Sequence, residues 1–203
     1  MKLLKQGAEA RLYKTVYLGR KAVVKVRERK KYRENSLDEK ILMERLRAEC
    51  NLLSRAKKAG VRTPAIWKIS LDEMAITTEF IEGRTLAEEL ARNTSKAKKF
   101  CAEAGKIIGK LHANNIVHGD LTTSNILLHN KSLVFLDFGL GSISSKIEDF
   151  AVDLLAFKKT FAATHYKIIG EWKNVERAYC AEFAQGKAVL GHLKEVEARA
   201  RYY

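Results

Sequence analysis

The sequence has 203 residues, of which 46% are hydrophobic, and its formal net charge is +14. This length allows one domain with a hydrophobic core, or two small lobes that share a cleft. No segment approaches the ~20 apolar residues of a transmembrane helix, and residues 1–10 lack the apolar stretch of a secretory signal. The three cysteines have neither metal-ligand spacing nor the pattern of a disulfide framework. We therefore expect a cytoplasmic protein with no membrane association.

The excess of basic residues favours a polyanionic partner such as RNA, because neutralised phosphates release counterions. The basic clusters are Arg27, Arg29, Lys30, Lys31 and Arg33; then Lys96, Lys98 and Lys99; and finally Arg199 and Arg201. A solvated basic face would explain any one of these clusters, and no RNA-binding motif accompanies them. Charge alone therefore leaves RNA binding open.

The first part of the chain is predicted to form strands and one long helix. Alternating or apolar stretches predict three strands, a helix of regular apolar period and then a hairpin. These elements cover residues 2–10, 11–18, 21–27, 38–60 and 65–81. Together they predict a five-stranded antiparallel sheet with one helix, and Gly60 is expected to end that helix.

The rest of the chain is predicted to be mostly helical, with a strand pair in the middle. Helices are expected at 85–93 and 95–115, strands at 126–128 and 133–137 around a turn at 129–131, and helices after Gly141. This order predicts an α+β protein of two lobes. We place the N-terminal lobe at 1–79, the hinge at 80–83 and the C-terminal lobe, with a short basic tail, at 84–203.

Lys25 lies in a predicted strand, and Glu49 lies in the predicted helix that follows. The apolar side of that helix is formed by Leu42, Leu46, Glu49, Leu53 and Ala56. A carboxylate on a buried face is costly unless it is paired. Lys25 is the nearest upstream candidate, so we expect a Lys25–Glu49 ion pair; the alternative is a sheet-edge lysine that reaches water.

Three polar residues in the middle of the chain could form a metal site. Asp120 and Asn125 lie in the loop "HGDLTTSN", and Asp137 follows two predicted strands. A hairpin of those strands would bring Asn125 and Asp137 together, and Mg²⁺ prefers oxygen ligands of this kind. Asp120 would remain free to accept or orient a proton. Such residues are also common in turns, but their order after Lys25 and Glu49 favours a chemical role.

The motifs "AVVK", "HGDLTTSN" and "DFG" resemble the protein-kinase superfamily in their order and spacing. The resemblance spans nearly the whole chain and implies a compact two-lobed protein-kinase-like fold that uses ATP and Mg²⁺. It implies that Lys25 holds the phosphates, braced by Glu49, and that Asp120 is the catalytic aspartate. By the same resemblance, Asn125 and Asp137 bind magnesium.

The nucleotide itself would contact five further positions, which the same resemblance assigns. Gly7 and Ala8 lie in the turn "QGAEA", which corresponds to the phosphate-covering loop although Gly7 is its only glycine. Val23 would pack on the adenine ring, and backbone groups of Glu79 and Ile81 would bind its edge.

Two departures from ordinary protein kinases occur in the C-terminal half. The loop reads His118-Gly119-Asp120, without the usual arginine, and Asp137 lies only sixteen residues before Asp153. That interval is too short for an activation segment, which docks peptide substrates. His118 itself is expected to be structural.

This combination is similar to one narrower family, the kinase-like ATPase subunit of the KEOPS complex, also called the p53-related protein kinase family, a relative of RIO-type serine/threonine kinases. "KQGAEA", "RLRAE", "DFGLG" and "EDFAVDL" fit it. The resemblance implies ATP hydrolysis that supports threonylcarbamoyladenosine modification of tRNA, with serine/threonine autophosphorylation. The implied partners are the KEOPS catalytic subunit (the threonylcarbamoyl transferase), a further small KEOPS subunit on the N-terminal lobe, and tRNA on the basic surface. Tail residues Arg199, Arg201 and Tyr202 would reach toward the partner or the nucleotide.

Three other functions stay open. A free-standing RIO-like serine/threonine kinase is weakened by the missing activation segment. An aminoglycoside-type small-molecule phosphotransferase also uses "HGD", but only 50 residues follow Asp153, which is short for an acceptor pocket. A scaffold without catalysis would have no need to retain all five polar site residues.

Overall fold

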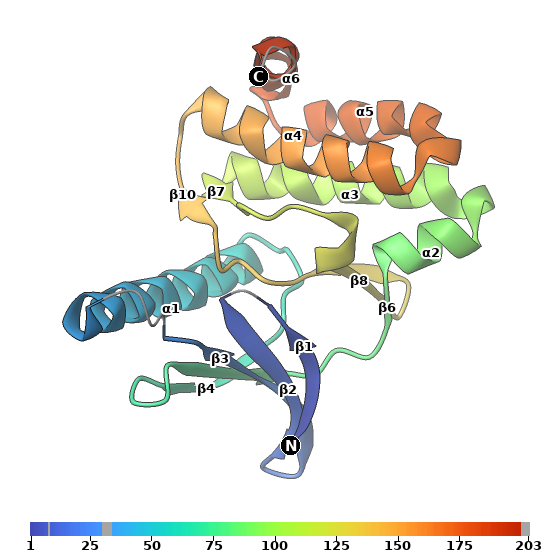
Figure 1. Ribbon diagram of the computed structural model, residues 1–203. Coiled ribbons are helices and arrows are strands. Elements are labelled where there is room, and N and C mark those ends of the chain that lie inside the picture. Colours follow the sequence, from blue (N-terminus) through green and yellow to red (C-terminus); the bar gives the residue numbers. More distant parts are fainter. Residues whose placement is uncertain (8, 30–33, 200–203) are drawn as a thin grey trace.

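The computed structural model describes residues 1–7, 9–29 and 34–199, which form two lobes (Figure 1). Some of the residues named above lie outside the described ranges, namely Ala8, Lys30, Lys31, Arg33, Arg201 and Tyr202. The expected α+β architecture, with a sheet-rich N-terminal lobe and a helical C-terminal lobe, is confirmed.

The N-terminal lobe is built on an antiparallel sheet with the order β1-β2-β3-β5-β4. Its strands are β1 (Lys2–Gln6), β2 (Ala10–Tyr17), β3 (Arg20–Arg27), β4 (Ile66–Ser70) and β5 (Ala75–Glu79). The helix α1 (Asn35–Lys58) connects β3 to β4 and lies between the sheet and the C-terminal lobe (Figure 1). The five strands and single helix predicted for this lobe are therefore confirmed.

The amphipathic pattern of α1 determines which side it buries. All five residues of the predicted stripe, from Leu42 to Ala56, are buried, including Glu49. The helix begins at Asn35, three residues before the predicted start, because the Glu34 side chain accepts a hydrogen bond from the Ser36 amide and caps the first turn. Gly60, with φ of 77°, turns the chain immediately after the helix.

The C-terminal lobe packs its helices around short strands. Its α-helices are α2 (Leu86–Arg92), α3 (Ala97–Ala113), α4 (Ile147–Thr164), α5 (Trp172–Glu182) and α6 (Gly186–Arg199). Its strands are β6 (Arg84–Thr85), β7 (Ile116–Val117), β8 (Ile126–His129), β9 (Ser132–Phe135) and β10 (Ser142–Ile143). The predicted hairpin is β8–β9, turning through Asn130 and Lys131, which both have positive φ.

The segment after Gly141 does not continue directly as helix, so that expectation is wrong. Ser142 and Ile143 form β10, which pairs antiparallel with β7 just before the "HGD" loop. Helix α4 begins only at Ile147. The nine residues between Asp137 and Ile147 thus connect directly back to the loop that carries Asp120, and no separate activation segment is formed.

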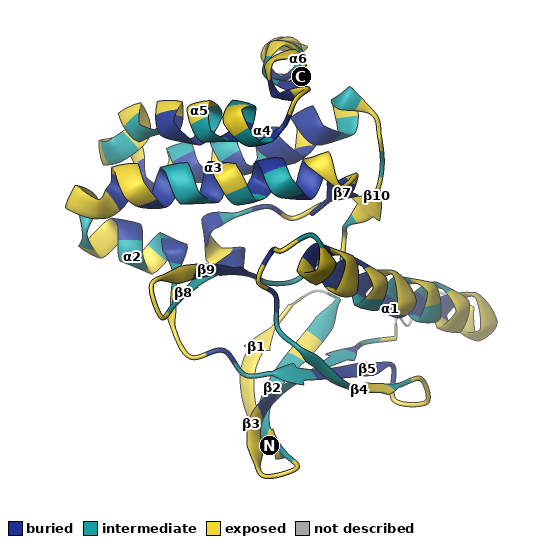
Figure 2. Cartoon of the chain, turned by 180° about the vertical axis from the view of Figure 1, so that it is seen from behind, coloured by how far each residue is buried: buried dark blue, intermediate teal, exposed yellow. Residues whose placement is uncertain are grey.

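The main hydrophobic core lies in the C-terminal lobe. Its buried side chains come from α2 to α6 and from β7 to β9, and the C-terminal end of α1 joins them through Leu52, Leu53 and Ala56. Figure 2 shows this contrast, since the helices of that lobe carry buried faces while β1 is exposed along its length. The strands of the N-terminal sheet therefore contribute no buried side chain to this core.

The connection between the lobes runs from the end of β5 at Glu79 to the start of β6 at Arg84. Residues 80–83 form neither helix nor strand, although the division of the chain at these positions stays a prediction. None of the helices in the described ranges is both long and apolar enough to cross a membrane.

Candidate active site

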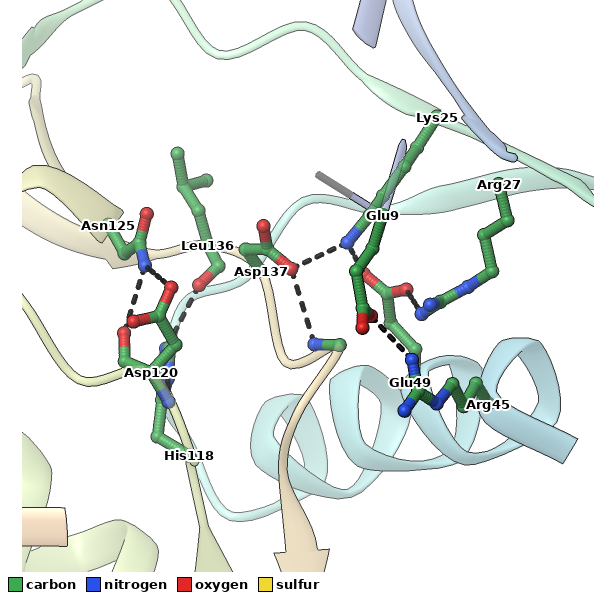
Figure 3. Close-up of polar contacts among 11 residues, drawn as sticks. Glu9, Lys25, Arg27, Arg45, Glu49, His118, Asp120, Asn125, Leu136 and Asp137 are labelled. Carbon is green, nitrogen blue, oxygen red and sulfur yellow. Dashed lines mark hydrogen bonds and ion pairs between the residues drawn. The ribbon is translucent and has the colours of Figure 1, made fainter. Parts of the chain in front are cut away.

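Lys25 joins the two lobes through ion pairs. It lies on β3 between Leu12 of β2 and Ile76 of β5 in the sheet register. Its Nζ donates to Glu49 Oε1 at 2.7 Å and to Asp137 Oδ1 at 2.5 Å (Figure 3). The predicted Lys25–Glu49 pair is confirmed, and the contact with Asp137 brings the third group of the expected site to the same amine.

The loop from His118 to Asn125 is fixed by hydrogen bonds of the Asn125 amide. Its Nδ2 donates to the backbone carbonyl of Asp120 at 2.9 Å and to Asp120 Oδ2 at 2.8 Å. The backbone carbonyl of Asn125 accepts a hydrogen bond from the backbone amide of Leu136, the residue before Asp137. The hairpin β8–β9 thus returns the chain to the loop and places Asp120, Asn125 and Asp137 around one cavity.

The donor set at this cavity fits a hard divalent cation. Asn125 Nδ2 donates twice to Asp120, and the amide oxygen Oδ1 has no hydrogen-bond partner among the described residues. Asp137 Oδ1 contacts Lys25, and φ of 56° at Asp137 holds this residue in the left-handed region. Two oxygen-bearing side chains are the number with which proteins commonly hold Mg²⁺ beside a phosphate.

The carboxylate of Asp137 is ionised in this setting. Burial raises the pKa of Asp137, but the Lys25 ammonium and the hydrogen bonds from Lys25 and the Gly139 amide outweigh burial, so that its pKa is lowered. The described residues contain no cluster of three or more His, Cys, Asp or Glu side chains suited to a metal. A cation here would therefore complete its ligand sphere with phosphate oxygens or water.

The cavity has an apolar part and a polar part. The apolar part is lined by Val23, Ile76, Ile81, Leu127 and Leu136, with Glu79 at its edge. The adjoining polar part is lined by Gly7, Lys25, Arg27, Asp120 and Asp137. Lys25 and Asp137 line both parts. This is the arrangement expected for a ligand with a flat apolar group and an anionic tail.

The positions predicted to bind adenine and phosphate lie around this cavity. Val23, Glu79 and Ile81 line the apolar part, and Gly7 lines the polar part, where its amide donates to the Ala10 carbonyl at 2.9 Å. The Glu79 amide donates to the carbonyl of Ala65. Among the described residues, no backbone hydrogen bond occupies the amide of Ile81.

Two buried groups behind the loop were not predicted from the sequence. Asp153, on α4, accepts hydrogen bonds from the backbone amides of His118 at 2.8 Å and Gly119 at 2.9 Å. His112, on α3, places Nε2 3.2 Å from Asp153 Oδ2 and Nδ1 2.7 Å from the Tyr179 hydroxyl. The available signal was an acidic residue on the buried side of α4, the same signal that identified Glu49.

His118 is structural, as expected. It is fully buried, its Nε2 lies 2.9 Å from the Leu136 carbonyl, and its ring packs on Phe138. Burial lowers the pKa of His118, which the neighbouring carboxylates only partly offset. The neutral ring then donates from Nε2 and accepts the Asp120 amide at Nδ1.

Arg27 does not belong to an exposed basic cluster, so that expectation is wrong. Only 5% of the residue is exposed, and its Nη2 donates to Glu49 Oε2 at 2.5 Å. Lys25 and Arg27 are two residues apart in one strand, which places both side chains on the same face of the sheet. Of the other basic residues, Arg29, Lys96, Lys98, Lys99 and Arg199 are exposed.

Comparisons with known proteins agree with this geometry. Residues 1–167 match the family described as "Protein kinase domain". The "KEOPS complex subunit Bud32" of Pyrococcus abyssi is 39% identical to the chain, and the match covers all of this chain and 96% of that protein.

Longer relatives match over the same region. A "Probable bifunctional tRNA threonylcarbamoyladenosine biosynthesis protein" of Methanothermobacter thermautotrophicus is 37% identical over 98% of this chain, and one of Methanobrevibacter smithii is 40% identical over 98%. The chain spans about a third of the length of these relatives, since 36% of each is matched.

The fold comparison extends to a solved structure of low sequence similarity. "WaaP in complex with acyl carrier protein" has a TM-score of 0.67 at 16% identity, and the match covers 98% of this chain and 88% of that one. This likeness supports the fold alone. The family match and the full-length relative show that the chain belongs to the protein kinase domain family and, within it, to the family of the KEOPS complex subunit Bud32.

Proposed function

We propose that this chain is a cytoplasmic, Mg²⁺-dependent ATPase with serine/threonine kinase chemistry that supports threonylcarbamoyladenosine modification of tRNA within a KEOPS complex. One observation carries the proposal: Lys25 Nζ contacts both Glu49, at 2.7 Å, and Asp137, at 2.5 Å, at the mouth of one cavity. Full-length similarity to a KEOPS subunit supports the biological setting.

The adenine ring would occupy the apolar part of the cavity. Val23 would pack against one face of the ring, and the backbone amide of Ile81 would donate to its edge. Glu79 would offer its backbone carbonyl, because its amide is already bonded to Ala65. Gly7 and the adjoining Ala8 would cover the phosphates.

The polar part would hold the phosphates and the acceptor. Lys25 would donate to phosphate oxygens while Glu49 fixes the direction of its amine, and this preorganised charge would stabilise the negative charge of the transition state. Asp120, held by the Asn125 amide, would orient the attacking water or hydroxyl group.

Magnesium is the cation that suits the donors at this site. Asn125, through Oδ1, and Asp137, through its ionised carboxylate, would hold it. When bound, Mg²⁺ would neutralise charge on the phosphates. With Asp137 as a ligand of the cation, Lys25 would be free to pair with the phosphates.

The proposed partners follow from the relatives and from the charge of the chain. The relatives named as bifunctional join a region like this one to a longer chain, which supports a close association with a second activity, here the threonylcarbamoyl transferase subunit. A further small KEOPS subunit would bind the N-terminal lobe. The net charge of +14 supports contact with tRNA.

ATP turnover tests the proposal. Hydrolysis is measured for the wild type and for Asp120→Ala and Asp137→Ala, each with and without the transferase subunit and tRNA. We expect stimulation by the partners in the wild type and its loss in both variants. Turnover that is absent in the wild type, or unaffected by both substitutions, would refute the proposal.

The same assay separates the alternatives. A free-standing kinase would label itself or another protein with phosphate at a rate that the partners do not change. A small-molecule phosphotransferase would show turnover only after an amino alcohol such as an aminoglycoside is added.

A further inference from the structure

Glu49 has two cationic partners, one on each carboxylate oxygen. Lys25 Nζ donates to Oε1 and Arg27 Nη2 donates to Oε2, and both cations come from strand β3 (Figure 3). Glu49 is 3% exposed, so it needs a compensating charge. One cation is enough for that purpose, which leaves the second available for another role.

Arg27 has hydrogen-bonding capacity that the protein does not use. The Nε atom of Arg27 is buried, and no described residue accepts its hydrogen. A buried donor without an acceptor is uncommon and calls for a reason, such as a ligand that is not yet bound. A guanidinium has five N–H donors in a fork that matches phosphate oxygens.

The surroundings of Arg27 show what such a ligand would be. Arg27 lines the polar part of the cavity together with Lys25, Asp120 and Asp137. A substituent built on Gly139 would lie 3.3 Å from Arg27 Nη2, 3.0 Å from Lys25 Nζ and 3.0 Å from Asp137 Oδ1. Arg27 therefore approaches the same point as the two groups that are proposed to hold phosphate and metal.

The turn that covers this part of the cavity supplies few donors for an anion. Gly7 is the only glycine among residues 6–10, and its amide is bonded to the Ala10 carbonyl. Lys5 also lines the cavity, but it belongs to the exposed edge strand β1. Among the described residues that line this part, Lys25 would thus be the one well-oriented cation for a triphosphate unless Arg27 takes part.

We propose that Arg27 is a second phosphate-binding residue, whose guanidinium donates to an oxygen of the terminal phosphates when nucleotide binds. This inference rests on the proposed function, since it takes the cavity to be a nucleotide site. Because Nε is closed to solvent in the free protein, the Arg27 side chain has to turn toward the cavity. Lys25 stays paired with Glu49, so the movement of Arg27 does not leave the buried carboxylate without a partner.

Equilibrium binding of AMP, ADP and ATP, each with Mg²⁺, tests the proposal directly. We expect Arg27→Met to weaken ATP binding by roughly tenfold or more, as for the removal of one charge-assisted hydrogen bond, and to leave AMP binding unchanged. Arg29→Met is the matched control, because Arg29 is an exposed neighbour paired with Glu39 and does not line the cavity. Equal loss of AMP and ATP affinity in Arg27→Met would overturn the proposal, since it would indicate a collapsed pocket.

A second pair of variants separates phosphate binding from support of Glu49. In Glu49→Gln the buried carboxylate is absent, so Arg27 has no charge to balance. We expect Arg27→Met/Glu49→Gln to bind ATP about tenfold more weakly than Glu49→Gln alone. Equal ATP affinity of these two proteins would overturn the role of Arg27 while leaving the nucleotide site intact. A wild type that binds no ATP would instead refute the proposed function.

Discussion

Asp153 Oδ1 accepts a hydrogen bond from the backbone amide of Gly119 at 2.9 Å, across 34 residues of sequence. Its other oxygen accepts the His118 amide and lies 3.2 Å from His112 Nε2. Burial raises the pKa of Asp153, but the hydrogen bonds with the His112 side chain and the His118 amide outweigh burial, so that its pKa is lowered. Asp153 thus fixes the position of the loop that presents Asp120.

Asp153→Asn should destabilise the protein, because an amide cannot accept hydrogen bonds on both sides. One of the two loop amides then faces an NH₂ group in a buried site. We expect the free energy of unfolding to fall by about 3 kcal/mol, measured by urea denaturation. Glu148→Gln, on the exposed side of the same helix, should change it by less than about 0.5 kcal/mol. Equal effects of the two substitutions would contradict the role of Asp153.

Two glycines near the site should respond differently to alanine. Gly119 has φ of 81°, and a Cβ there would lie 2.1 Å from the Leu140 carbonyl oxygen, which is backbone and cannot yield. Gly119→Ala should therefore cost about 3 kcal/mol or more of stability. At Gly139 the nearest atoms are the ends of the Lys25 and Asp137 side chains, at 3.0 Å.

Gly139→Ala should thus fold with a loss of less than about 1 kcal/mol, while the displaced Lys25 and Asp137 lower ATP turnover by about tenfold or more. Thermal unfolding and turnover are measured on the same preparations. A variant at position 139 with normal turnover would show that the two charged groups need not keep their positions.

Much of the site was predictable because burying a charge requires a partner. The acidic residue in the apolar stripe of α1 indicated a paired Glu49, and the strand–turn–strand pattern correctly predicted the hairpin β8–β9 between Asn125 and Asp137. The same reasoning, applied to α4, would have indicated Asp153, and the two-residue period of β3 would have placed Arg27 beside Lys25.

Other features left no readable pattern in the sequence. Strand β10 has two residues, Ser142 and Ile143, and depends on pairing with β7, which is distant in the sequence. Periodicity cannot be read over so short a stretch. Arg27, the second partner of Glu49, was not predicted for a different reason. It lies close in the sequence to further basic residues, so it was assigned to their cluster.

Acid should destabilise the fold through two buried histidines. Burial lowers the pKa of both His118 and His165 below the usual value of 6.5. The unfolded chain then binds more protons than the native state below pH 6.5, so stability is full above that pH and falls as the pH drops. Urea unfolding at about pH 8, 7, 6 and 5 should show a plateau and then a decline.

His165→Gln should lessen this decline, because glutamine does not titrate. The glutamine side chain can still form a hydrogen bond with the Thr123 hydroxyl, which lies 3.2 Å from His165 Nε2 in the wild type. Asp137 and Asp153, whose pKa values are lowered by their partners, contribute only at lower pH, since their unfolded pKa is near 3.8. A stability profile that is flat between about pH 6.5 and 5 would contradict the buried, neutral state of these rings.

Contact with tRNA should depend on the exposed lysines at the start of α3. Lys98 and Lys99 line a groove together with Arg177 of α5. The double variant Lys98→Glu/Lys99→Glu should weaken tRNA binding and lower the slope of log affinity against log salt by about one for each phosphate that is no longer neutralised. Lys68→Glu, an exposed single lysine on β4, is the control. An unchanged salt slope would make the groove an ordinary solvated surface.

Removal of either partner of the Lys25–Glu49 pair should reduce catalysis, but to different extents. Lys25→Ala removes the charge that is proposed to contact the phosphates, so we expect a loss of a few kcal/mol of transition-state stabilisation, on the order of 10²–10³ in turnover. Glu49→Ala removes only the group that orients Lys25, and Asp137 still contacts the amine at 2.5 Å. Its effect on turnover should therefore be smaller, while its effect on stability should be larger, because Arg27 loses its partner in a buried site. ATP turnover and urea unfolding of both variants provide the two measurements.

Turnover in Glu49→Ala equal to that of the wild type would show that Glu49 does not orient Lys25. A greater loss of turnover than in Lys25→Ala would show that Glu49 has a catalytic role beyond orienting Lys25.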